Sequence, residues 1–69
     1  MTKSQRKRLV KASGLSPTIL ANELGLNRST VLRVIDGAAK SRRVATHVAL
    51  RCGQTLAAMF PIYAAEDAA

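Results

Sequence analysis

Two arginines and a serine in the stretch "LNRSTVLRVID" have side chains that could bind a polyanion or hydrogen-bond to the edge of a nucleic-acid base. At about 100° per residue, Arg28, Ser29 and Arg33 fall on one half of a helix. The other half is apolar and consists of Val31, Val34 and Ile35. Arginine can donate two hydrogen bonds to guanine, and serine can donate or accept. Most polar helix faces are merely solvated, so this face alone assigns no function.

The charge of the whole chain favours a polyanionic partner. Eleven Lys and Arg face four Asp and Glu, for a formal net charge of +7. Such an excess predicts binding to nucleic acid first and to an anionic membrane surface second. Basic residues crowd the first turns of the chain: Lys3, Arg6, Lys7, Arg8 and Lys11.

Several function classes find no support in the residue types. The single cysteine, Cys52, excludes an internal disulfide and fits a reducing cytoplasm. His47 has no acid or thiol at ligand spacing and is expected at the surface, and no metal site, nucleophile elbow or phosphate-binding glycine loop is present. We therefore expect no catalysis, no cofactor and no small-molecule ligand. No signal peptide or membrane span is expected, which predicts a cytoplasmic protein.

Length and composition favour an all-α fold. A chain of 69 residues forms one domain, which buries only about 60% of its unfolded surface. Aromatic residues make up 3% of the chain and alanine is abundant, which favours closely packed helices over a sheet.

The periodic apolar positions, together with capping residues, predict five helices. Ser16 and Asn27 are candidate N-caps, and Gly25 and Gly37 are candidate helix stops. The stretch "AAKSRR" is expected to be a loop, and the end of the chain, about residues 64–69, a loose tail. The expected helices are Thr2 or Lys3 to Ala12, Pro17–Leu24, Arg28–Asp36, Val44–Cys52 and Gln54–Met59.

The stretch "PTILANELGLNRSTVLRVID" resembles the helix-turn-helix of the Cro and lambda-type repressors of bacteriophages. That motif has a small residue at the position of Ala21 and glycine at the position of Gly25. Its apolar positions match Leu20, Leu24, Leu26, Val31 and Val34. The family usually continues with Asn-Gly, where this chain has Asp36-Gly37. The resemblance implies a compact five-helix lambda repressor-like domain, with the motif at about residues 16–37.

The resemblance continues through "VALRCGQTLAAMFP", which is similar to the fourth and fifth helices of that family, so it covers roughly residues 6–61. Arg51 and Gln54 depart from the small or apolar residues that are more usual there.

The resemblance also implies which residues contact double-stranded DNA. Base contacts fall to Arg28, Ser29 and Arg33, with Thr30 able to offer a methyl group to thymine. Asn27 either caps the helix or reaches a base. The free N–H groups at Ser16 and Thr18 suit a phosphate. Further phosphate contacts are expected from Lys3, Lys40, Ser41, Arg42 and Arg43.

An apolar cluster near the end of the chain is larger than a domain of this size needs, so we expect part of it in the core and part on a two-fold dimer surface, as in the resembled repressors. Its members are Leu56, Met59, Phe60, Ile62 and Tyr63. A dimer would place two recognition helices about 34–36 Å apart, one helical turn of DNA. The expected function is a transcriptional repressor that binds an inverted-repeat operator as a homodimer and autoregulates its operon.

A phage or another mobile element is the expected setting for such a repressor. Regulators associated with anti-CRISPR genes are small proteins of this kind, so this chain could be one of them. One alternative is a DNA-binding antitoxin whose C-terminal apolar patch binds a toxin. The other is a membrane-surface or protein-interaction module that uses the basic N-terminus.

Overall fold

The computed structural model describes residues 1–63, and the expected loose tail lies outside them. Within that range the chain is helical and has no strand, which confirms the all-α class. No helix in the range is long and apolar enough to cross a membrane. The elements are α1 (Lys3–Ala12), α2 (Pro17–Leu24), α3 (Arg28–Asp36), α4 (Arg42–Arg51), α5 (Leu56–Met59) and a 3₁₀ turn, η1 (Pro61–Tyr63).

The first three helices begin and end where the local sequence signals predict. Thr2 and Gln5 form a capping box: the Thr2 hydroxyl accepts from the Gln5 amide at 3.2 Å, and the Gln5 side chain accepts from the Thr2 amide at 2.8 Å. The Ser16 hydroxyl accepts from the Ile19 amide and caps α2. Gly25 ends α2 in the left-handed conformation, with φ 69°.

The expected start of the fourth helix was wrong by two residues. Ser41 is the N-cap of α4 and its hydroxyl accepts from the Val44 amide at 3.3 Å. Arg42 and Arg43 therefore form the first turn of a helix and are not part of a loop. Similarly, α5 begins at Leu56 rather than Gln54, because the Thr55 hydroxyl caps it by accepting from the Ala58 amide.

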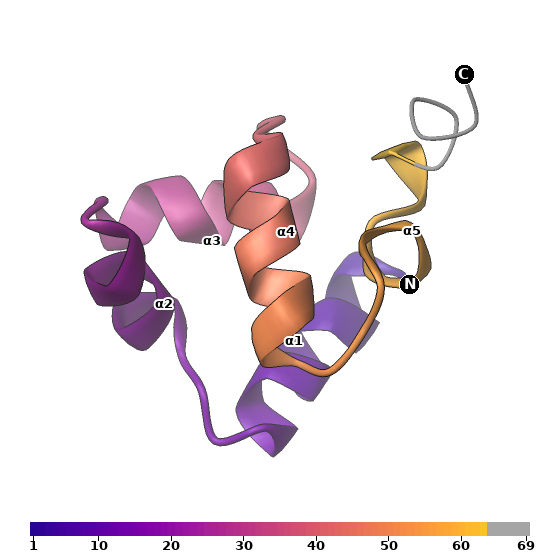
Figure 1. Cartoon of the computed structure of the whole chain (residues 1–69), viewed down its shortest axis with the longest axis horizontal. Coiled ribbons are helices and arrows are strands. Elements are labelled where there is room, and N and C mark those ends of the chain that lie inside the picture. Colours follow the sequence, from indigo (N-terminus) through magenta and orange to yellow (C-terminus); the bar gives the residue numbers. More distant parts are fainter. Residues whose placement is uncertain (64–69) are drawn as a thin grey trace.

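Helix α4 is the centre of the molecule. Figure 1 shows it between α2 and α3 on one side and α5 on the other, and α4 contacts all three. Its inner face is made of small and β-branched residues that allow neighbouring helices to approach closely: Val44, Ala45, Val48 and Ala49. The largest buried side chains from the other helices are Leu20, Val31, Val34, Ile35 and Met59.

The end of the described chain closes the core. Phe60 and Tyr63 are 3% and 2% exposed, and their rings meet edge to face with centroids 6.3 Å apart. The Tyr63 hydroxyl accepts a hydrogen bond from the Ser41 amide at 2.9 Å, so η1 is attached to the first turn of α4. Met59 is completely buried beside them.

This burial assigns three members of the expected cluster to the core, so they are corrected as dimer-surface residues. Met59, Phe60 and Tyr63 fill the core of the single chain, because a domain this small needs its few large side chains there. Of the expected cluster, Ile62 is 53% exposed and Leu56 is half-buried. The antitoxin alternative needs an exposed apolar surface for a toxin. That surface is smaller than expected, because the same three residues are buried.

Arg6 is a core residue, although the sequence groups it with the basic surface of the first turns. Its side chain is 8% exposed and makes cation–π contact with the Phe60 ring, 5.1 Å from the ring centroid. The guanidinium donates to the carbonyl oxygens of Ile35 and Met1 at 2.6 and 2.7 Å. A buried cation thus joins α1, α3 and the segment after α5.

Candidate nucleic-acid interface

Helix α3 divides into an exposed polar face and a buried apolar face. Arg28, Ser29 and Arg33 are exposed, as is Thr30. The inward residues Val31, Val34 and Ile35 are 0%, 2% and 1% exposed. The expected division of this helix is therefore confirmed, and all four candidate base-contacting residues of α3 point away from the core.

The turn between α2 and α3 fixes the position of that face. Helix α2 packs closely on α3. The small side chain of Ala21, on α2, is buried. After Gly25, the Leu26 amide donates to the Ala21 carbonyl at 2.9 Å and completes the turn. A Cβ at Gly25 would meet no atom within 4 Å, so glycine is needed here for its positive φ and not for space.

Asn27 occupies the N-cap position of α3, but its side chain makes no capping hydrogen bond. Its main-chain carbonyl accepts from the Thr30 amide at 3.1 Å, which is sufficient to start the helix. The side-chain amide is exposed at the same end of α3 as Arg28. Of the two roles that the sequence left open, side-chain capping is not the one observed.

The candidate phosphate-binding residues at the start of α1 and α2 differ in exposure and in whether their side chains already make a hydrogen bond. Lys3 and Thr18 are exposed in the first turns of their helices. Ser16 is half-buried, and its hydroxyl already accepts from the Ile19 amide. The Ser16 hydroxyl oxygen therefore caps α2. Its hydroxyl hydrogen and its main chain are the groups that remain for a phosphate.

The remaining candidates follow α3 and enter α4. Lys40, Arg42 and Arg43 are exposed, and Arg43 donates from Nη2 to the Leu24 carbonyl at 3.4 Å. That contact places a cation at the C-terminal end of α2, where the helix dipole favours it. Ser41 caps α4 with its hydroxyl and donates its amide to Tyr63, so its main role is structural.

A cluster of charged residues that the sequence analysis missed connects α2 to α4. Glu23 Oε1 lies 2.7 Å from His47 Nε2 and 3.0 Å from Arg51 Nε. Hydrogen bonds from Arg51 and then from His47 lower the pKa of Glu23 below its ordinary value. His47 therefore has an acidic partner 24 residues away in sequence. The only sequence signal was the four-residue spacing of His47 and Arg51, which places both on one face of a helix.

Within residues 1–63, no group of three His, Cys, Asp or Glu side chains could hold a metal ion. Cys52 is buried, and its burial raises the pKa of the thiol, which makes it a weak nucleophile. The arrangement can instead present arginine and hydroxyl donors to an anionic or hydrogen-bonding surface.

Comparison with protein-family models, with curated proteins and with solved structures finds no match to this chain.

Proposed function

We propose that this protein is a sequence-specific, double-stranded DNA-binding transcriptional repressor, with α2 and α3 as its helix-turn-helix. The observation that carries the proposal is the division of α3, which has arginine and hydroxyl side chains on its exposed face and a fully buried apolar face. In this proposal α3 enters the major groove, which is about 12 Å wide and admits one helix.

The side chains of this face suit base recognition. Arg28 and Arg33 lie five positions apart, so they can reach different base pairs, and each can donate two hydrogen bonds to one guanine. Ser29 and Thr30 lie between them and offer hydroxyls, and the Thr30 methyl can contact thymine. Asn27 is exposed at the start of α3, and its side-chain amide, which is not engaged in capping, is a further hydrogen-bonding group there.

Exposed cations and one hydroxyl, placed before and after α3 in the chain, suit the phosphates that flank a groove. Lys3 and the hydroxyl of Thr18 precede α3, and the cations Lys40, Arg42 and Arg43 follow it. An anionic membrane would also attract a chain of charge +7. Membrane binding needs no hydrogen-bonding groups on a helix held by a tight turn, whereas base recognition does, so these groups favour DNA.

The proposal includes a homodimer on an inverted-repeat operator in the promoter of its own operon, in a phage or another mobile element. A second copy doubles a contact area that a single small module lacks. The exposed Ile62 and the half-buried Leu56 are the members of the expected apolar cluster that are accessible for such a contact.

Selection of bound sequences from a pool of random duplexes tests the proposal. We expect enrichment of an inverted repeat whose half-sites are about 10 base pairs apart, centre to centre. An Arg8→Ala variant, which removes an exposed cation of α1, should select the same motif, whereas an Arg28→Ala/Arg33→Ala variant should not. Recovery of unenriched sequences by the unmodified protein would overturn the proposal.

A further inference from the structure

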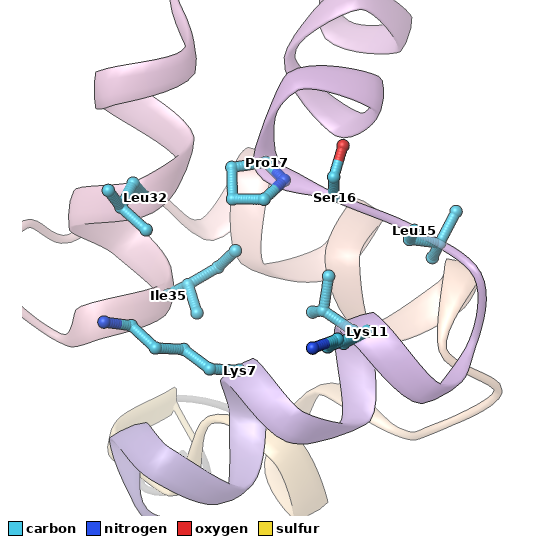
Figure 2. Close-up of a pocket in the computed structure, with 8 residues that line it drawn as sticks. Lys7, Lys11, Leu15, Ser16, Pro17, Leu32 and Ile35 are labelled. Atoms are coloured by element: carbon cyan, nitrogen blue, oxygen red, sulfur yellow. The ribbon is translucent and has the colours of Figure 1, made fainter.

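A cleft of about 400 Å³ lies between α1, the start of α2 and α3. Figure 2 shows Lys7 and Lys11 along its α1 side, Leu15 and Pro17 at the entry to α2, and Leu32 and Ile35 on α3. The volume lies within the range of about 300–1,000 Å³ that is typical of small-molecule sites.

The walls of the cleft are apolar. Ile35 is 1% exposed and belongs to the core, whereas Leu15 is partly buried against it. Leu32 is half-buried, yet within residues 1–63 it is not one of the side chains that pack on the core. An apolar molecule in the cleft would therefore cover a leucine that the fold leaves partly open to water.

The charges around the cleft favour an occupant with a single negative charge. Lys7 Nζ lies 3.0 Å from Asp36 Oδ1, so its charge is already compensated. Lys11, one helical turn further along α1, is exposed and pairs with no carboxylate in the described residues 1–63. One uncompensated cation beside an apolar cleft suits a monocarboxylate better than a polyanion.

We propose that this cleft binds a small aromatic monocarboxylic acid. The apolar rings lie against Pro17, Leu32 and Ile35, and the carboxylate accepts from Lys11 Nζ. The class of ligand follows from the apolar lining, the volume and the one uncompensated lysine. This proposal stands without DNA binding.

One consequence of the cleft does depend on the proposed function. Leu32 precedes Arg33 on α3, and Pro17 precedes Thr18 on α2, so an occupant would lie beside two candidate DNA contacts. Occupation of the cleft should then weaken binding to the operator.

Titration of the full chain with 1-naphthylacetate, followed by ligand fluorescence and by amide NMR shifts, tests the site. We expect saturable binding, with the largest shifts at Lys11, Leu15 and Leu32. Lys11→Gln should weaken binding roughly two- to fivefold, the effect of one solvent-exposed ion pair. Arg8→Gln, an equal change in charge at another position of α1, should leave binding unchanged. Leu32→Gln should weaken binding of the acid and of the neutral analogue 1-naphthaleneethanol alike.

Three outcomes would overturn the site. The first is 1-naphthaleneethanol binding as tightly as the acid, and the second is inorganic phosphate producing the same shifts. The third is equal affinities for Lys11→Gln and Arg8→Gln, which would show that only the overall charge matters. A DNA titration kept separate from these measurements shows whether the occupant acts on the operator. Absence of that effect, with operator binding intact, would count against the coupling of the cleft to α3 and not against the cleft; absence of operator binding itself would count against the proposed function.

Discussion

Arg6 donates a hydrogen bond from Nε to the main-chain carbonyl of Ile35, over 2.6 Å and inside the protein. The carbonyl belongs to the last turn of α3, where no further helical amide is available to donate to it. The guanidinium also makes a cation–π contact with Phe60 and donates to Met1. A side chain from α1 thus stabilises the end of the helix that we propose reads DNA.

Replacement of Arg6 should destabilise the protein. Arg6→Met leaves the buried Ile35 carbonyl without a partner and removes a charged hydrogen bond, so we expect a loss of about 2–4 kcal/mol in the free energy of unfolding. Urea denaturation measures it. Arg8→Met, at an exposed position of the same helix, is the matched control. Equal stabilities of the two variants would contradict the buried role.

The Glu23 cluster should make stability depend on acid pH. Because the folded-state pKa of Glu23 is lowered, its carboxylate stabilises the fold above the ordinary value of about 4.3. That contribution is lost as the pH falls from the ordinary value of the glutamate pKa through the lowered pKa of the folded state. The difference in unfolding free energy between the unmodified protein and Glu23→Gln should therefore shrink across this window. A difference that is constant with pH would rule out the carboxylate as its source.

Arg33 should contribute to the choice of sequence. We expect Arg33→Ala to cost about 1–3 kcal/mol on the selected operator and to relax specificity at one base pair. Arg28→Ala should act in the same way at another base pair. Binding measured on the operator and on each single-base variant separates the effects. Equal weakening on every sequence would mean that the arginine contacts only phosphate.

Salt should weaken DNA binding steeply. If six to eight phosphates are neutralised, log K should fall against log salt concentration with a slope of roughly −5 to −7. Arg43→Gln, which removes one of the proposed phosphate contacts, should make that slope shallower by about one. Fluorescence anisotropy over a range of salt concentrations gives both slopes. A slope near zero would contradict the proposed contacts between the cations and the DNA phosphates.

Ile62 should contribute to self-association. It is 53% exposed, so Ile62→Lys should preserve the fold and shift sedimentation from a dimer towards a monomer of 7.4 kDa. Leu50, 73% exposed on α4, provides a control as Leu50→Lys. If only Leu50→Lys dissociates the dimer, the dimer surface lies on α4 and not at Ile62.

Local signals made the helices predictable from the sequence. Ser16 and Pro17 start α2, and Gly25 and Gly37 stop α2 and α3 because their positive φ values end a helix sharply. The fourth helix was predicted to start late because Arg42 and Arg43 look like loop residues until Ser41 is recognised as a cap. The polar face of α3 was predictable because it needs only helical periodicity.

Contacts between distant residues were not predictable. Arg6 and Ile35 lie 29 positions apart, and Glu23 and Arg51 lie 28 apart. Nothing in a single sequence distinguishes a buried arginine from its exposed neighbours Lys7 and Arg8. Which members of the apolar cluster are buried was not predictable for the same reason, since periodicity within a short apolar segment does not indicate whether Tyr63 turns inward.

Gly37 ends α3 with φ 81°, so its position keeps glycine whatever residue stands at position 6. Position 60 depends on position 6, because its aromatic ring is the face over which the Arg6 cation lies. Positions 6 and 60 should therefore covary in natural variants. A variant with an aliphatic residue at position 6 would lose the reason for an aromatic at 60, and a search for distant homologues can use that pair as its signature.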